Sequence, residues 1–118
     1  MYFAICLAMG VATEACAYVL KFWLYRNAGL RILNIVFIFG LIFGGMSWLL
    51  ADQGMLLRFA VGAGFGIAYE IVNDRWLKAW YFHGGTLPWL SGQPAVIGVG
   101  LTWGFVPVMA GVLARALA

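Results

Sequence analysis

The feature that most constrains this chain is an apolar run of 20 residues, 32–51, that contains no charged side chain. At a rise of about 1.5 Å per residue, a helix of that length spans about 30 Å, the thickness of the hydrocarbon core of a bilayer. Similar runs flank it, and together they predict four membrane spans at residues 2–22, 32–51, 55–80 and 94–115. Because 65% of the 118 residues are hydrophobic and only 9% are charged, a soluble fold of this size could not bury the apolar surface. We therefore expect an integral membrane protein whose main partner is the lipid bilayer.

Four spans joined by short connections favour an all-α fold in a single domain, residues 1–118, with the transmembrane helices arranged as an up-and-down bundle. Strands are not expected, because no segment alternates polar and apolar residues as a membrane barrel requires. Pro107 lies within the last predicted span. Since proline cannot donate a backbone hydrogen bond, it predicts a kink that frees the carbonyl group of Trp103.

Three Gly-x-x-x-Gly patterns occur in the last three predicted spans: Gly40/Gly44, Gly62/Gly66 and Gly100/Gly104. Small residues at this spacing let helix backbones approach closely inside a membrane, either within one bundle or between copies. The patterns therefore favour a homo-oligomer or a place in a larger membrane complex.

The seven basic residues are too scattered to form a nucleic-acid surface, and they flank the predicted spans instead. Two of them, Arg58 and Arg115, belong to one side of the predicted bundle, and Arg58 is expected to extend its long side chain to the interface. Five lie on the other side: Lys21, Arg26, Arg31, Arg75 and Lys78. Because cytoplasmic loops are rich in Lys and Arg, this asymmetry predicts a multi-pass protein of a bacterial inner membrane with both termini outside the cytoplasm.

Glu14 stands near the middle of the first predicted span, where an ionised carboxylate costs at least a few kcal/mol. On a helix it shares a face with Tyr18 and Lys21, so the tyrosine hydroxyl is one candidate partner. Two interpretations follow. The carboxyl group could exchange a proton for a cation in a small transporter, or it could stay protonated and hydrogen-bond to a neighbouring helix.

A second polar cluster closes the third predicted span and contains Tyr69, Glu70, Asn73 and Asp74. Glu70 and Asp74 are four residues apart, so their carboxylates lie one helical turn from each other on the same face and repel. A hard divalent cation, with His83 as a further ligand, would neutralise them and could serve an enzyme acting on lipid phosphates. The alternative is an ordinary helix end leaving the membrane. No cofactor is expected otherwise.

Over its whole length the chain resembles the small multidrug-resistance transporters, which share its size, four spans and a glutamate in the middle of the first helix. Two local segments carry the same resemblance: Gly66-Ile67-Ala68-Tyr69 in the third span and Pro94-Ala95-Val96-Ile97-Gly98 at the start of the fourth. The resemblance implies an antiparallel dimer in which Glu14 is the shared site for protons and substrate and Tyr69 lines that site. The family has no counterpart of the cluster from Glu70 to Lys78.

The last third of the chain also resembles part of larger bacterial membrane proteins, some of them linked to carotenoid synthesis. The shared pattern is an acid, an aromatic pair, a Gly-x-Pro turn and a helix tryptophan: Glu70, Trp80-Tyr81, Gly92-Gln93-Pro94 and Trp103. Such proteins have more spans, so this resemblance implies a half-size relative.

These observations lead us to expect a transporter-like bundle that binds a small cationic or amphipathic solute through an intramembrane carboxylate, foremost Glu14. Two alternatives remain open. One is a membrane-embedded enzyme that acts on a lipid or isoprenoid substrate through Glu70, Asp74 and His83. The other is an accessory subunit that docks on a larger complex through its glycine-rich helix faces.

Overall fold

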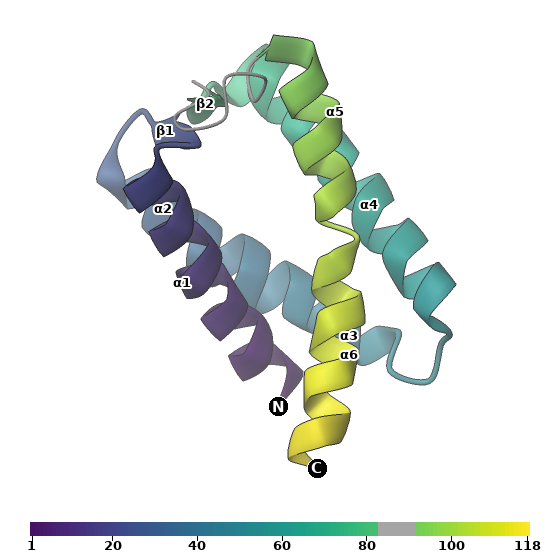
Figure 1. The fold of residues 1–118 in the computed structure, drawn as a ribbon. Helices are drawn as coiled ribbons and strands as arrows, with labels where there is room; N and C mark the ends of the chain where they lie inside the picture. Colours follow the sequence, from purple (N-terminus) through teal and green to yellow (C-terminus); the bar gives the residue numbers. More distant parts are fainter. Residues whose placement is uncertain (83–91) are drawn as a thin grey trace.

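The computed structural model describes residues 1–82 and 92–118, and it confirms an all-α bundle of four membrane-length helices (Figure 1). Both chain termini lie at the same end, as an even number of antiparallel spans requires. The four spans cover Tyr2–Leu20, Ala28–Leu49, Met55–Leu77 and Ala95–Leu117, and each is long and apolar enough to cross a membrane. The chain is therefore a multi-pass membrane protein by the length and composition of its helices.

Three of the four spans are built from more than one helical segment. The second consists of a helix, a π-helical stretch and a further helix, the third ends in a π-helical turn, and the fourth is broken in two. In chain order the elements are α1 (Tyr2–Leu20), β1 (Trp23–Tyr25), α2 (Ala28–Leu33), η1 (Asn34–Phe43), α3 (Gly44–Leu49), α4 (Met55–Val72), η2 (Asn73–Leu77), β2 (Trp80–Phe82), α5 (Gly92–Thr102) and α6 (Phe105–Leu117).

The helix ends differ from the predicted boundaries for identifiable reasons. The second span begins at Ala28 because the side chain of Asn27 accepts a hydrogen bond from the backbone N–H of Leu30, at 3.0 Å, and so caps the first turn. The first and third spans end early, each at a lysine in the left-handed conformation, with φ of 54° at Lys21 and 49° at Lys78. Both lysines turn the chain out of its helix.

Two short strands follow those lysines and pair with each other across one end of the bundle (Figure 1). Strands β1 and β2 are antiparallel, with Trp23 opposite Phe82 and Tyr25 opposite Trp80. The expectation of no strands is therefore wrong for these six residues. The paired segments lie far apart in the sequence, so neither shows the local alternation that identifies a longer strand. We refer to this pair, residues 23–25 and 80–82, as the ribbon.

Close glycine contacts bring the third and fourth spans together within the bundle. A Cβ atom added to Gly66 would lie 2.4 Å from the carbonyl oxygen of Gly100 and 2.4 Å from Cβ of Trp103. Gly62 packs in the same way against Pro107. On the other side of the bundle, Gly44 packs against Phe3 of α1. Each of these approaches leaves no space for a side chain at the glycine.

The fourth span breaks between α5 and α6, four residues before Pro107, where the sequence predicts a kink. Tight turns replace the helical bonds there, with the N–H of Gly104 bonded to the carbonyl of Leu101 at 3.0 Å and that of Val106 to the carbonyl of Trp103 at 3.1 Å. The break places the indole ring of Trp103 in the core, 5.3 Å from the ring of Phe43 and stacked on it.

Arg58 extends to the turn at the end of its span, but its guanidinium group is not exposed there, because only 1% of the residue is accessible. Its guanidinium group instead donates hydrogen bonds to backbone carbonyls of the turn between α3 and α4, from Nε to Gln53 at 3.1 Å and from Nη2 to Ala51. Gly111 of α6 leaves space for this group, since a Cβ there would collide with Nη1. Orphan carbonyls at a helix end are good acceptors, so the buried arginine closes the turn.

Candidate functional site

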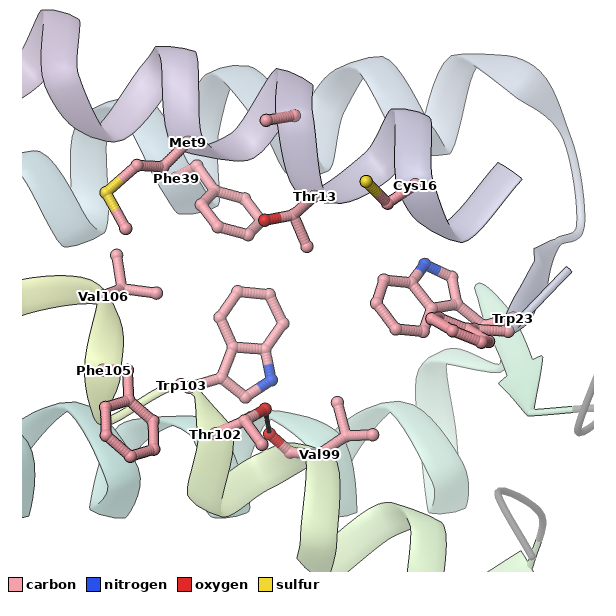
Figure 2. A pocket seen from close by; sticks show the side chains of 12 residues that line it. Met9, Thr13, Cys16, Trp23, Phe39, Val99, Thr102, Trp103, Phe105 and Val106 are labelled. Atoms are coloured by element: carbon pink, nitrogen blue, oxygen red, sulfur yellow. Dashed lines mark hydrogen bonds between the residues drawn. The ribbon is translucent and has the colours of Figure 1, made fainter. Parts of the chain in front are cut away.

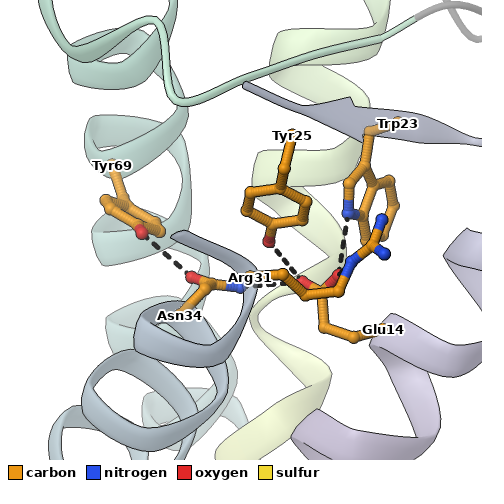
Figure 3. Close-up of polar contacts among 6 residues, drawn as sticks. All are labelled: Glu14, Trp23, Tyr25, Arg31, Asn34 and Tyr69. Carbon is orange, nitrogen blue, oxygen red and sulfur yellow. Dashed lines mark hydrogen bonds and ion pairs between the residues drawn. The ribbon is translucent and has the colours of Figure 1, made fainter. Parts of the chain in front are cut away.

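Glu14 lies in α1 beneath the ribbon, with 2% of its surface exposed. Figure 3 shows its carboxylate surrounded by donors from three segments. Oxygen Oε1 accepts hydrogen bonds from the hydroxyl of Tyr25 at 2.5 Å and from the amide of Asn34 at 2.8 Å. Oxygen Oε2 accepts one from the indole of Trp23 at 3.2 Å and lies 3.4 Å from Nε of Arg31. The carboxylate thus has both neutral donors and a positive counterion.

Tyr18, the partner expected from helical spacing, does not hold Glu14, because the residue is 67% exposed on the outside of the bundle. Its ring instead contacts Arg31, whose guanidinium carbon lies 5.0 Å from the ring centre of Tyr18 and equally far from that of Tyr25. Burial, followed by the negative charge of Glu14, raises the pKa of Tyr25. The Tyr25 hydroxyl therefore remains protonated and able to donate.

A hydrogen-bonded bridge joins Glu14 to the third span through Asn34, the first residue of η1. The Asn34 amide nitrogen donates to Glu14, while its oxygen accepts from the hydroxyl of Tyr69 at 2.9 Å (Figure 3). Asn34 is itself buried, so both ends of its amide need partners inside the protein. The bridge ties α1, the second span and α4 together at one depth.

Glu70, the next residue after Tyr69, is 1% exposed and is held by two indoles. Trp80 of β2 donates to Oε2 at 3.0 Å, and Trp103 at the break in the fourth span donates to Oε1 at 2.9 Å. Among the described residues no basic side chain forms an ion pair with it. Glu14 and Glu70 thus differ, because within residues 1–82 and 92–118 a counterion is found at Glu14 and not at Glu70.

Asn73 holds the ribbon to the third span, and its side-chain amide bonds to the ribbon rather than to the carboxylate of Glu70. Its oxygen accepts hydrogen bonds from the backbone N–H groups of Ala79 at 2.8 Å and Trp80 at 3.3 Å, and its nitrogen donates to the carbonyl of Trp80 at 2.8 Å. Because Trp80 is the donor to Glu70, Asn73 is a positioning residue for that contact.

Asp74 is half-buried in η2, where its backbone carbonyl accepts a hydrogen bond from the ammonium group of Lys78. His83, the third ligand of the hypothetical metal site, lies outside the described residues. Within residues 1–82 and 92–118, no three His, Cys, Asp or Glu side chains come together as a metal site would require. Both oxygens of Glu70 already accept indole hydrogen bonds.

Replacing Asn73 with Ala is expected to loosen the ribbon while leaving the four spans in place. The change removes three hydrogen bonds and leaves the N–H and carbonyl groups of Trp80 without their partner, so we expect a loss of about 1 to 2 kcal/mol of unfolding free energy. Amide hydrogen exchange at Ala79 and Trp80 should accelerate in micelles. Exchange at Ala63 in α4 serves as the internal reference, and equal protection of the ribbon in both proteins would contradict the role of Asn73.

A cavity of about 570 Å³ lies between α1 and the break in the fourth span (Figure 2). Its walls are mostly apolar and include Met9, Phe39 and Val106. Trp23 and Trp103 also line it, and Figure 2 shows both indoles projecting into the space between the helices. One hydrogen-bond donor to each of Glu14 and Glu70 therefore forms part of the cavity wall, although neither carboxylate is among the described lining residues.

Three donors to Glu14 were not singled out by the sequence: Trp23, Tyr25 and Asn34. The two donors to Glu70, Trp80 and Trp103, belong with it to the pattern shared with larger bacterial membrane proteins, which assigned them no role. A buried carboxylate needs donors, so the tryptophans and tyrosines nearest the span ends were the available signal. Three comparisons give no further guide, since the chain matches no protein-family model, no curated protein and no solved structure.

Proposed function

We propose that this chain is a small transporter-like membrane protein that binds an amphipathic cation. The apolar part of the solute occupies the 570 Å³ cavity, and its positive group reaches Glu70. The observation that carries the proposal is the position of Trp103, which lines the cavity and at the same time donates to a buried carboxylate that has no counterion among the described residues. The volume lies in the range of known small-molecule sites, about 300 to 1,000 Å³.

Glu70 is a better ligand for a cation than Glu14 on electrostatic grounds. The charge of Glu14 is already compensated by Arg31, so a second cation there would meet a repelling neighbour. The two indoles at Glu70 supply N–H dipoles and no net charge. A buried carboxylate held only by neutral donors gains most from a cationic partner. The proposal therefore keeps the expected class of solute, an amphipathic cation, and places its positive group at Glu70 instead of Glu14.

The cavity also fits the apolar part of such a solute. Phe39 and Trp103 present aromatic surface, and cations attached to apolar groups bind favourably to aromatic faces. The cavity and both carboxylates belong to one chain, so the site proposed here is complete in a single copy. Rotation of the Trp103 side chain about its own bonds would open the path from the cavity to Glu70, because that indole lies between the two.

Binding of tetraphenylphosphonium to the purified full chain in lipid nanodiscs tests the proposal. We expect saturable binding of this cation and, in a separate titration, no saturable binding of tetraphenylborate, a sphere of similar size and opposite charge. Glu70→Gln should weaken binding at least tenfold, because the substitution removes the charge and keeps a side chain of nearly the same shape. A tenfold loss corresponds to about 1.4 kcal/mol.

Asp52→Asn is the matched control, since it removes an exposed carboxylate from the turn between α3 and α4, at the far end from the ribbon. It should bind as the parent does. Equal affinity of the parent and Glu70→Gln for the cation would refute the role of Glu70. Absence of any binding to the parent, with the chain recovered in a stable heteromeric complex, would favour the accessory-subunit alternative.

A further inference from the structure

A second cavity, of about 280 Å³, lies on another side of the bundle, between the second span and the end of the third. Asn34, Tyr69 and Trp80 form part of its wall, and these are the residues that link the two carboxylates to the helices and the ribbon. In contrast to the 570 Å³ cavity, its described lining includes a charged side chain, that of Arg26.

Arg26 is exposed at the edge of this cavity, next to the ribbon. Its backbone N–H donates to the carbonyl of Ala79 at 2.7 Å, which fixes the residue at the end of β1. Within the described part of the chain its guanidinium group forms no ion pair, whereas nearby Arg31 is paired with Glu14. The positive group at the cavity edge is thus available for an anion.

The remaining wall is apolar and faces outward. Leu33, Phe37 and Leu77 line the cavity and are also exposed on the outer surface of the bundle. In a bilayer this surface contacts acyl chains, because all three residues belong to membrane-spanning segments. Arg26 lies just outside those segments, at the level where headgroups begin. The cavity therefore combines a lipid-facing apolar wall with a cation at headgroup depth.

We propose that this cavity is a binding site for an anionic phospholipid. The phosphate group pairs with Arg26, and one acyl chain lies along Leu33 and Phe37. Arginine suits this role because its planar guanidinium group can donate two parallel hydrogen bonds to a phosphate. A net negative headgroup is favoured over a zwitterionic one, since three further basic residues lie at the same end of the bundle: Lys21, Arg75 and Lys78.

Native mass spectrometry of the full chain released from nanodiscs of equal parts phosphatidylglycerol and phosphatidylcholine tests this site. We expect the parent protein to retain phosphatidylglycerol in preference to phosphatidylcholine. Arg26→Gln should reduce that preference about fivefold, whereas Arg115→Gln, which removes an exposed base near the opposite end of the fourth span, should leave it unchanged. An equal preference in the parent and Arg26→Gln would overturn the proposal.

Two further arms separate the possible reasons for a loss. Arg26→Lys keeps a positive charge and should retain part of the preference, and circular dichroism of each variant in phosphatidylcholine should report unchanged helicity. Glycerol phosphate, added as a free anion, should not displace the retained lipid if the acyl chain contributes to binding. Displacement by that anion would show that the site recognises phosphate alone and would refute the proposed position of the chain.

Discussion

Glu14→Gln is expected to lower the unfolding free energy by about 3 kcal/mol, because it breaks a buried ion pair and replaces one acceptor oxygen with an NH₂ donor. The new amide oxygen can still accept from Tyr25 and Asn34, which both bond to Oε1 in the parent. The new NH₂ group, however, would face the indole N–H of Trp23 and the guanidinium of Arg31. The NH₂ group, the indole and the guanidinium are all donors, so each is left without an acceptor inside the protein. Burial of unpaired donors is what costs stability.

Unfolding of the purified chain by sodium dodecyl sulfate in mixed micelles, followed by circular dichroism, measures the loss. Tyr25→Phe provides an intermediate step, since it removes one hydrogen bond to Glu14 and should cost about 1 kcal/mol. Asp52→Asn, on the exposed turn, should change the value by less than about 0.5 kcal/mol. If Glu14→Gln behaved like Asp52→Asn, the carboxylate would not be fastening the ribbon to the bundle.

The spans could be predicted from the sequence because the bilayer imposes a simple rule on length. A segment such as residues 32–51 has to cross as a helix, since every backbone polar group must be satisfied within it. The rule says nothing about the connections. The ribbon pairs two connections that lie far apart in the sequence, one after α1 and one after the third span, and its three-residue strands have no periodicity of their own. It was therefore missed.

The two buried carboxylates were also predictable, but the partners of Glu14 were not. Helical spacing selects Tyr18 for Glu14, one turn further along α1. The helix ends at Leu20, however, and the chain reverses at Lys21, so Trp23 and Tyr25 of β1 return over Glu14 instead. Only the three-dimensional path of the connection decides between the candidates.

The aromatic residues near the span ends divide into two groups that sequence alone does not separate. Trp48 and Trp76 are exposed, as expected for residues at a membrane interface. Trp80 has a similar position in the sequence, yet it is buried and donates to Glu70. The difference arises from Asn73, which fixes the backbone of Trp80 on both its N–H and carbonyl sides and directs the indole inward.

Gly66→Ala is expected to separate the third span from the fourth and to disturb the indole that holds Glu70. The added Cβ would lie 2.4 Å from the carbonyl oxygen of Gly100, a backbone atom that cannot move without its helix. Overpacking of this kind costs about 1 to 3 kcal/mol, and we expect the upper part of that range because the contact is with backbone. The same Cβ would lie 2.4 Å from Cβ of Trp103, so the hydrogen bond from its indole to Glu70 should lengthen as well.

Gly64→Ala is a matched control on the same helix, because a Cβ at Gly64 would meet no atom within 4 Å. Its intrinsic effect on a helix should be neutral or stabilising by about 0.5 to 1 kcal/mol. Unfolding in mixed micelles compares the two variants, and tryptophan fluorescence reports the indole environment. A loss of stability in Gly66→Ala with unchanged fluorescence would place the strain away from Trp103. Equal stability of the two variants would show that the third and fourth spans are not packed backbone to backbone at Gly66, and the path from Glu70 to the cavity through Trp103 would then lose its support.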